Sequence, residues 1–253
     1  MITVAMVLRS GGQYAPAHVR ALGHQVRERL KGVPHHIRVL SDQPVAGVVA
    51  VPLGHGFPGW WSKIELFRPG VFADELVLYL DLDTIVTGDL APLARYPGDF
   101  AMLADFYEPA RLASGVMLFR PSPISAAIYE RFLADPAGIM RSEPHGDGGW
   151  IGRCVPDAGR IQEIWPGLAV SYKAAAVARD GLPDGARLLC FHGRPKPWDC
   201  GGVWQEIYET GDDPTLQSAP AHGVGGAALG AQQDADSYTR IAVQGDAEHG
   251  SAS

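Results

Sequence analysis

The apolar positions near the N-terminus follow two different patterns in turn. Residues 2–8 are apolar except for Thr3, which is typical of a buried strand. Apolar side chains then recur at helical spacing at Val19, Leu22, Val26 and Leu30. Pro16 suits the first turn of that helix. Two further short segments, residues 36–40 and 48–51, look like strands, so this region indicates a β-α-β unit and a mainly parallel sheet.

The strongest apolar run, residues 77–86, contains two carboxylates. Its Val, Leu, Tyr and Ile residues predict one strand that is buried on both faces. In an extended chain, residues i and i+2 project to the same side. Asp81 and Asp83 are therefore expected to point together, while Leu82 packs the other way.

Two ionised carboxylates at the end of a buried strand repel each other and lose hydration, which is unfavourable unless a cation lies between them. Mg²⁺ and Mn²⁺ take oxygen ligands and keep positions open for water and phosphate oxygens. Asp81 and Asp83 therefore predict a metal site that faces a nucleotide. The alternative is that one aspartate caps the following turn and the other is solvated.

The rest of the chain continues the α/β pattern and then loses it. Strands are predicted at residues 99–103, 115–119 and 188–192, and a helix is predicted at residues 123–133. From about residue 209 onward Ala, Gly, Gln and Asp dominate, and no periodicity remains. We therefore predict one globular domain over residues 1–208 and a mostly disordered tail over residues 209–253.

The composition narrows the functional classes. With 253 residues, of which 46% are hydrophobic, the chain is long enough for one α/β domain of generous size. A net charge of −7 without a Lys/Arg cluster argues against nucleic acid or an anionic membrane as the main partner. No apolar run approaches the ~20 residues that span a bilayer, and no charged leader opens the chain, so we expect a cytoplasmic protein without a transmembrane segment. The three widely spaced cysteines are expected to be reduced thiols rather than zinc ligands.

Two isolated polar residues have both a functional and a structural interpretation. Lys63 lies in a predicted short helix just before the acidic run, where it supplies a cation to a phosphate or is a solvated lysine. Asp147 lies in a glycine-rich turn, residues 145–149, and is either an active-site carboxylate or a helix cap. The local sequence leaves both alternatives open.

Both ends of the predicted domain also contain candidate residues. Gly11 and Gly12 follow the first predicted strand, where they permit a turn close to a ligand or form a plain tight turn. His192 ends the last predicted strand and is a candidate third metal ligand. Arg194 and Lys196 follow it in a proline-rich turn and are candidate phosphate clamps.

Four segments, in this order, resemble glycosyltransferase family 8, the nucleotide-sugar-dependent group that includes glycogenin and the bacterial lipopolysaccharide galactosyltransferases. Residues 62–64 are similar to its threonine-lysine-leucine segment and residues 79–86 to its acidic motif. Residues 114–117 are similar to its asparagine-serine-glycine-valine strand, and residues 193–198 to its terminal glycine-x-x-lysine-proline-tryptophan motif. The resemblance covers roughly residues 1–200.

The resemblance implies a fold and a reaction. The fold would be a single α/β domain of the nucleotide-diphospho-sugar transferase type (GT-A type), with a mixed, mainly parallel sheet flanked by helices. The reaction would move a sugar from a nucleotide diphosphate donor, a UDP-sugar, to a saccharide, lipid-linked or protein acceptor with retention of configuration. The family's metal is Mn²⁺, with Mg²⁺ as the substitute, and the resemblance places it on Asp81, Asp83 and His192.

The resemblance also implies roles for individual residues. Lys196 would support the departing diphosphate, and Asp147 would lie beside the sugar ring, so these two are the catalytic candidates. The donor-binding candidates are Val7, Arg9, Gly11, Gly12, Tyr14, Lys63, Asp81, Gly193, Arg194 and Lys196.

Three positions depart from the family pattern. Cys190 stands where the family has its metal-binding histidine, although His192 lies two residues further on. Ala113 replaces an asparagine, and Gly148 replaces a glutamine. These changes leave open a different donor, a different acceptor or a nucleotide-sugar binding protein without turnover.

A second enzyme class also places Asp-x-Asp after an apolar strand, namely the haloacid-dehalogenase phosphatases. In that fold the motif follows the first strand of the core, whereas three predicted strands precede it here. No acidic pair suited to holding the metal follows at a suitable spacing. The phosphatase is therefore the alternative and the glycosyltransferase the main prediction.

Overall fold

The computed structural model of the protein describes residues 1–73 and 75–210. Its strands are β1 (Ile2–Leu8), β2 (His35–Ser41), β3 (Val49–Pro52), β4 (Leu76–Leu80), β5 (Thr84–Val86), β6 (Phe100–Ala104), β7 (Leu112–Phe119), β8 (Gly159–Arg160), β9 (Ala169–Ser171) and β10 (Leu188–Cys190). Its α-helices are α1 (Pro16–Arg29), α2 (Ala91–Ala94), α3 (Pro123–Ala134), α4 (Pro136–Ser142), α5 (Gly146–Cys154), α6 (Ile161–Ile164), α7 (Val177–Asp180) and α8 (Gly202–Thr210). Two 3₁₀ helices complete the set, η1 (Gly59–Phe67) and η2 (Pro197–Asp199).

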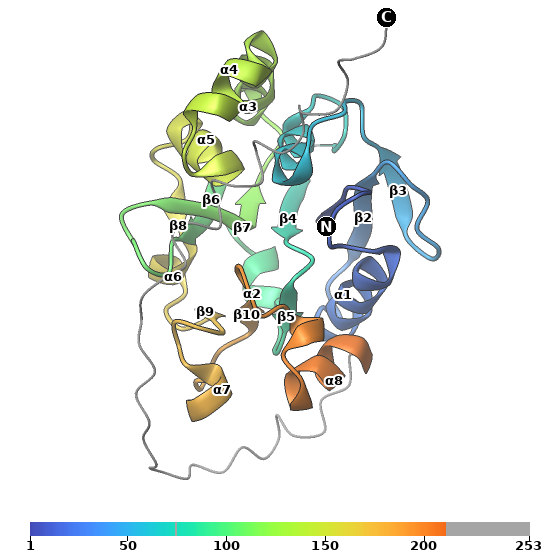
Figure 1. Cartoon of the computed structure of the whole chain (residues 1–253), viewed down its shortest axis with the longest axis vertical. Coiled ribbons are helices and arrows are strands. Elements are labelled where there is room, and N and C mark those ends of the chain that lie inside the picture. The colour runs from blue at the N-terminus through green and yellow to red at the C-terminus, as the bar shows by residue number, and fades with distance from the viewer. Residues whose placement is uncertain (74, 211–253) are drawn as a thin grey trace, which may run out of the picture. The chain divides into compact units, whose positions relative to one another are not determined.

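A seven-stranded sheet in the order β3-β2-β1-β4-β7-β6-β8 forms the centre of the fold (Figure 1). The first four of these strands are parallel, and β7 runs antiparallel to both β4 and β6. β8 pairs with β6 in parallel. The predicted mixed, mainly parallel sheet is therefore confirmed, as is the β-α-β beginning of the chain.

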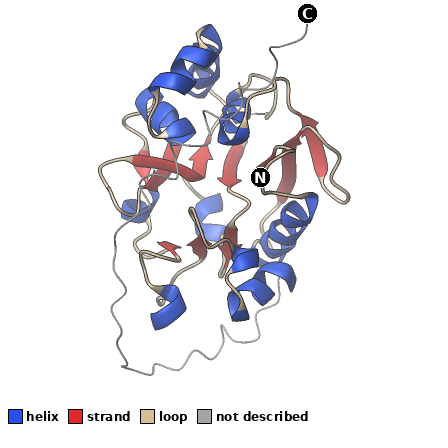
Figure 2. Ribbon diagram, in the orientation of Figure 1, coloured by secondary structure: helices blue, strands red, loops and turns tan. Residues whose placement is uncertain are grey.

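Apolar side chains cover both faces of this sheet, as the continuous apolar runs predict. In β1, Met6 and Leu8 belong to one core cluster while Ala5 and Val7 belong to another, because successive side chains point to opposite faces. Helix α1 packs on the first face, and η1, α3 and α5 pack on the second (Figure 2). Helices on both faces of a mostly parallel sheet make this an α/β architecture.

The single strand predicted for residues 77–86 is wrong, because the chain breaks at the two aspartates. β4 ends at Leu80 in the seven-stranded sheet, and β5 begins at Thr84 in a separate sheet of order β5-β10-β9. Between them Asp81, Leu82 and Asp83 form a turn, in which the Thr84 amide donates to the Asp81 carbonyl at 3.1 Å. The turn brings the carboxylates to the sheet edge, where each reaches a lysine, while a straight strand would enclose them among apolar side chains.

The last predicted strand is shorter than expected, and one further helix follows it. β10 ends at Cys190, so His192 lies in the loop beyond it. Helix α8 then packs against α1 and η2. The predicted domain boundary after residue 208 falls inside α8, so residues 209 and 210 of the predicted disordered tail are helical, and the rest of that tail lies outside the described residues.

The described residues belong to one compact unit. Within them, no helix combines the length and the apolar character that crossing a bilayer requires. All three cysteines are described, and they form no disulfide.

Leu118 provides a test of the core assignment. Its side chain is fully buried in β7, which pairs with strands on both sides. We expect Leu118→Ala to lower the free energy of unfolding by about 2–5 kcal/mol, because it leaves a cavity in a packed layer. Urea denaturation measures this change. Leu133→Ala is the matched control: its side chain is 38% exposed, so the loss should stay near 0.5 kcal/mol. Equal losses in the two variants would contradict the described sheet.

Candidate functional site

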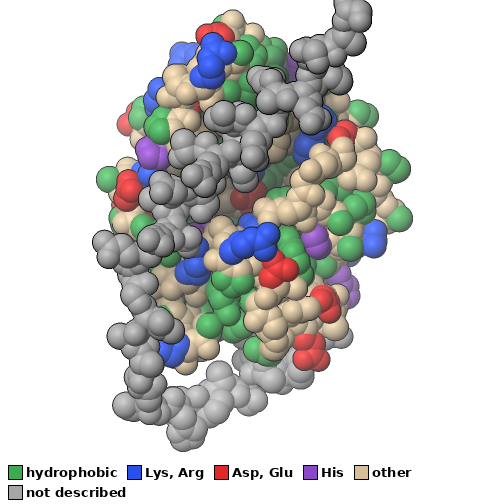
Figure 3. Space-filling model, viewed as in Figure 1, with side chains coloured by type: hydrophobic (Ala, Val, Ile, Leu, Met, Phe, Trp, Pro, Cys, Tyr) green, Lys and Arg blue, Asp and Glu red, His purple; other side chains and the backbone are tan. Residues whose placement is uncertain are grey.

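The site forms at the edge of the sheet where β1 and β4 end and β7 begins. β1 and β4 are parallel, with Ala5 opposite Tyr79, so their carboxyl ends lie at the same edge. The acidic turn follows β4 at this edge, and its Asp81 amide donates to the Gly115 carbonyl of β7 at 2.9 Å. Ligands of open α/β sheets bind beyond the carboxyl ends of the strands. Acidic and basic side chains lie close together around a hollow in one face of the molecule (Figure 3).

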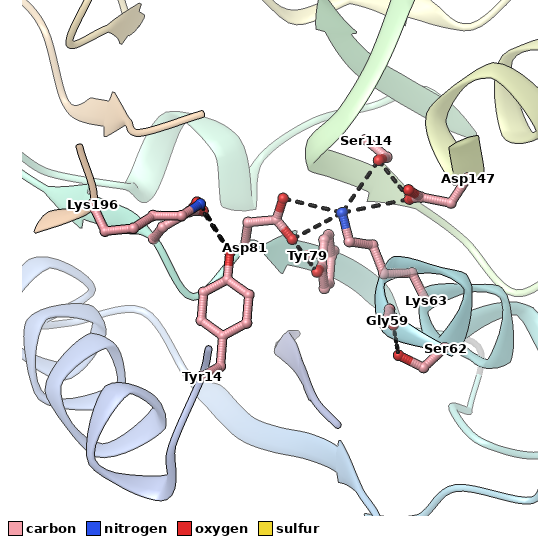
Figure 4. A network of polar contacts seen from close by, with 10 residues as sticks. Tyr14, Gly59, Ser62, Lys63, Tyr79, Asp81, Ser114, Asp147 and Lys196 are labelled. Carbon is pink, nitrogen blue, oxygen red and sulfur yellow. Dashed lines mark hydrogen bonds and ion pairs between the residues drawn. The ribbon is translucent and has the colours of Figure 1, made fainter. Parts of the chain in front are cut away.

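Lys63 lies at the centre of one half of the site. Its ammonium bonds both carboxylate oxygens of Asp81, at 3.0 and 3.1 Å, and lies 3.4 Å from the Asp147 carboxylate (Figure 4). It also donates to the Ser114 hydroxyl at 3.3 Å. The Lys63 side chain is only 12% exposed, so the alternative of a solvated helix lysine is wrong.

Asp147 is buried at the first turn of α5, yet its side chain does not cap that helix. The Ser114 hydroxyl donates to the Asp147 carboxylate at 2.6 Å, and the Lys63 ammonium lies on the same oxygen. The helix-cap interpretation of Asp147 therefore fails, and its carboxylate points towards Asp81 and Lys63 (Figure 4). Three elements, η1, β7 and α5, thus contribute to this half of the site.

Asp83, Lys196 and Tyr14 form the other half. Lys196 and Asp83 form an ion pair in which the side chains are only 6% and 7% exposed. The Tyr14 hydroxyl donates to the same Asp83 oxygen at 3.0 Å, and the Lys196 ammonium lies 3.4 Å from that hydroxyl (Figure 4). Lys196 precedes η2 and Tyr14 precedes α1, so segments from both ends of the described chain meet at Asp83.

Burial and neighbouring charges shift the protonation equilibria of this cluster. Burial raises the pKa of Asp83 and Asp147 above the ordinary value, and the lysine ammoniums act in the opposite direction. Burial works to lower the pKa of Lys63, but the carboxylates of Asp147 and Asp81 outweigh it and hold that pKa above its ordinary value. Burial also raises the pKa of Tyr14, so its hydroxyl keeps the proton that it donates to Asp83.

The two carboxylates fit part of the predicted metal site. Asp81 and Asp83 supply oxygen ligands, which suit Mg²⁺ or Mn²⁺ held by one or two carboxylates together with substrate phosphates. Among the described residues, no three His, Cys, Asp or Glu side chains form a group that could hold a metal. His192 therefore does not complete a three-ligand set with the aspartates here, because its ring nitrogen Nε2 lies 2.6 Å from the Ser171 hydroxyl. Cys190 is a buried thiol whose pKa burial raises, which makes it a poor substitute ligand.

Several other donor-binding candidates form their contacts away from the two aspartates. Arg9 pairs with Asp42 at 3.2 Å, and Arg194, 79% exposed, pairs with Asp199 at 3.1 Å. Gly11 takes a positive φ of 82°, which a glycine adopts without strain, and it has open space beside it. Val7 packs in the core at the end of β1, and Gly193 also has a positive φ.

The structure adds two residues that the sequence reasoning gave no separate role. The Tyr79 hydroxyl donates to Asp81, and Ser114 links Lys63 to Asp147. Ser114 lies in residues 114–117, which resemble a family motif, so the sequence could have indicated a role for it. Tyr79 carried no signal, because it reads as one more apolar member of a buried strand.

Gly148, which stands where the resembled family has a glutamine, packs closely against Ser114. A Cβ atom built at Gly148 would lie 3.3 Å from both the amide nitrogen and the hydroxyl of Ser114. That is tighter than an ordinary contact, so β7 and α5 approach each other more closely here than a side chain at position 148 would comfortably allow.

Solved structures show that this chain shares the fold of known glycosyltransferases. GlyE of Streptococcus pneumoniae TIGR4 matches with a TM-score of 0.62 at 18% identity, over 83% of this chain and 60% of that chain. LgtC, a galactosyltransferase solved in complex with donor and acceptor sugar analogues, matches with a TM-score of 0.58 at 13% identity, over 81% and 95%. The bifunctional WbbM matches with a TM-score of 0.54 at 14% identity, over 78% and 46%.

The chain thus spans only about 60% of the GlyE chain. No protein-family model matches the sequence, and no curated protein matches it at a significant level. At such low identities the likeness establishes the GT-A fold that the resemblance implies. In this chain the acidic turn follows β4, the fourth strand. In the phosphatases the Asp-x-Asp motif follows the first strand of the core, so nothing in the architecture supports that alternative.

His192 makes the stability depend on pH. Burial lowers the pKa of His192 from its ordinary 6.5 to about 4, and the nearby Lys173 charge adds to the shift. Between these values the unfolded chain binds a proton that the folded chain excludes, so stability is lost as the pH falls from 6.5 towards 4. We expect His192→Asn to reduce this loss, measured without divalent metal as the difference between melting temperatures at pH 7 and pH 5. Asn replacing the exposed His36 controls for removing an imidazole, and an unchanged difference in His192→Asn would contradict the assignment.

Proposed function

We propose that this protein transfers a glycosyl group from a nucleotide diphosphate donor, a UDP-sugar, to a hydroxyl of an acceptor. The observation that carries the proposal is the pair of buried lysine-carboxylate clusters at the carboxyl edge of a GT-A sheet. Lys63 holds Asp81 and Asp147, and Lys196 holds Asp83. Such buried, oppositely charged groups in one place cost hydration, and groups in such environments cluster at functional sites.

The charges of this cluster suit the departure of a diphosphate. Glycosyl transfer builds negative charge on the leaving diphosphate, so catalysis needs positive groups that are already in place. Lys196 is about 95% buried, and Tyr14 and Asp83 fix its ammonium from one side. A phosphate oxygen reaching this ammonium meets a cation that needs little further desolvation or reordering.

A divalent metal belongs to the same proposal. Asp81 and Asp83 would hold Mn²⁺ or Mg²⁺ jointly with the donor diphosphate, and the ion would neutralise charge on the leaving group when bound. The carboxylates are at present bonded to Lys63 and Lys196. Binding of metal and diphosphate therefore implies that each ammonium moves from a carboxylate to a phosphate or sugar oxygen.

Asp147 is proposed to bind a sugar hydroxyl beside the reacting carbon. Ser114 and Lys63 hold one of its carboxylate oxygens, which fixes the direction of the other. Because burial raises its pKa, this carboxylate is also a stronger proton acceptor than a solvated one. Retention of the sugar's configuration remains a prediction from the resemblance.

The end of β1 is proposed to bind the nucleoside. Arg9 and Ser10 are joined to Asp42, the residue after β2, and the Ser10 amide donates to that carboxylate at 2.9 Å. This arrangement braces the glycine turn between β1 and Tyr14. Val7, Arg9, Gly11, Gly12 and Tyr14 are thus proposed as the wall along the base and ribose.

The acceptor is proposed to be a saccharide, either free, lipid-linked or attached to protein. LgtC, which has the same fold, is described in complex with donor and acceptor sugar analogues. A cytoplasmic location and the absence of a nucleic-acid partner stay predictions from the composition.

Nucleotide-dependent stabilisation tests the donor class. We expect UDP to raise the melting temperature in the presence of Mn²⁺ and to have little effect in EDTA. A ligand at 100 times its Kd stabilises the native state by about 2.7 kcal/mol, which is roughly 5–10 °C for a domain of this size. Parallel samples with ADP, GDP and CDP identify the base. Equal stabilisation in EDTA would remove the metal from the proposal, and no shift with any nucleotide would overturn the proposal itself.

Asp147→Asn separates an enzyme from a binding protein. We expect transfer, or donor hydrolysis, to fall about 10²–10³-fold, since a positioned charged group is lost from the reacting centre. The Mn²⁺-dependent shift with UDP should change little, because Asp147 bonds Lys63 and Ser114 rather than the donor diphosphate site. Asp180→Asn, at an exposed carboxylate of α7, is the control. Wild-type protein that binds UDP-sugar without hydrolysing or transferring it would instead identify a binding protein.

A further inference from the structure

The acidic turn is held by backbone hydrogen bonds and by one side chain from outside the site. The turn is tied by its Asp81 amide to the Gly115 carbonyl at 2.9 Å and by its Asp83 carbonyl to the Phe191 amide at 3.1 Å. The remaining carbonyl, that of Leu82, accepts a hydrogen bond of 2.6 Å from the Tyr208 hydroxyl of α8. Leu82 is the residue between the two aspartates, so this bond acts on the middle of the turn.

The bond is enclosed within the protein. Tyr208 is 1% exposed and Leu82 is 2% exposed, and the two residues are 126 positions apart in the sequence. Water therefore cannot replace the hydroxyl if it is removed, and the Leu82 carbonyl must then remain unpaired or move. Moving that carbonyl rotates the peptide planes on which both aspartates lie.

Gln25 fixes the helix that carries Tyr208. Its side-chain oxygen accepts from the Val86 amide of β5 at 2.8 Å, and its nitrogen donates to the Tyr208 carbonyl of α8 at 3.3 Å. Gln25 is itself 1% exposed in α1. One buried amide thus joins α1, β5 and α8, and both of its ends are used, which sets its orientation.

Aromatic rings link the same helix to the other side of the turn. Trp198 stacks on His18 with ring centroids 4.0 Å apart and contacts Tyr208 at 5.6 Å. It also meets Tyr14 edge-on at 5.7 Å, and the Tyr14 hydroxyl holds Asp83. Helix α8 is therefore linked to the acidic turn in two ways. The Tyr208 hydroxyl bonds the Leu82 carbonyl directly, and Trp198 packs between Tyr208 and Tyr14, whose hydroxyl bonds Asp83.

We propose that Tyr208 is a positioning residue for the acidic turn, with Gln25 as its support, and that docking of α8 sets the mutual orientation of the Asp81 and Asp83 carboxylates. Tyr208 touches neither the donor nor the metal. It acts through the Leu82 carbonyl, so the reaction depends on a helix that lies outside the sheet and follows the last motif residue in the chain. This inference rests on the proposed function for its effect on turnover, while the contact itself can be tested without it.

Tyr208→Phe removes only the hydroxyl, and Tyr96→Phe is its matched control. The Tyr96 hydroxyl also donates to a backbone carbonyl, that of Phe100 at 2.9 Å, and Tyr96 is 8% exposed. The two variants lose the same kind of bond at different places. We expect similar falls in melting temperature, but only Tyr208→Phe should lower the Mn²⁺-dependent affinity for UDP, by about tenfold, and kcat by about 10–100-fold, since a displaced carboxylate no longer meets the donor correctly.

A second variant and a second measurement complete the test. Gln25→Met keeps a side chain of similar length and removes both amide bonds, so it should lower UDP affinity and kcat in the same direction as Tyr208→Phe. Hydrogen exchange, measured without any ligand, should be faster over residues 82–86 in Tyr208→Phe than in the wild type and in Tyr96→Phe. Wild-type UDP affinity and unchanged exchange in Tyr208→Phe would overturn the positioning role.

The same data separate this inference from the proposed function. If the wild-type protein binds no nucleotide but exchange over residues 82–86 is faster in Tyr208→Phe, the proposed function fails and the role of Tyr208 in holding the turn stands. If the wild-type protein binds UDP with Mn²⁺ and Tyr208→Phe binds it equally, the proposed function stands and the positioning role fails.

Discussion

The buried ion pair between Lys196 and Asp83 is the interaction on which the rest of the site depends. Neither charge is stable in an apolar interior alone, so each requires the other at a fixed distance. Asp83 is the last residue of the acidic turn, and Lys196 lies more than a hundred residues further along the chain. The fold must therefore bring two distant segments together. The parallel strands, the second sheet and the loop after β10 achieve this meeting, and the Tyr14 hydroxyl completes it.

The division of the chain between two sheets follows from the same constraint. A strand that continued through Asp81 and Asp83 would bury both carboxylates among the apolar side chains of β4 and β5. The turn instead moves them to an edge, where Lys63 meets one and Lys196 the other. Two ammoniums then balance the two carboxylates of the turn, and in the proposed function a diphosphate with its metal ion would exchange partners with these four groups. The acidic turn is thereby both a structural joint and the centre of the proposed chemistry.

Two departures from the family pattern, at Gly148 and near His192, correspond to specific contacts in the structure. Gly148 allows β7 and α5 to approach closely, which places the Ser114 hydroxyl on the Asp147 carboxylate. His192 turns to Ser171 instead of joining the aspartates. In the proposed function, Gly148 and Ser114 would alter the side of the site that faces the sugar, and His192 would alter the side that holds the metal.

The sequence alone determined the β-α-β beginning of the chain and the mainly parallel sheet, and it singled out Asp81, Asp83, Lys63 and Lys196 as candidates, because apolar periodicity and short motifs are local properties. Only the tertiary structure decided how those residues combine. The break of the acidic strand, the assignment of each lysine to its carboxylate, and the support of the turn by Tyr208 depend on contacts between residues that lie far apart in the chain. Periodicity reports which face of an element is buried, but not which distant group satisfies a buried charge or carbonyl, and that choice fixes the geometry of this site.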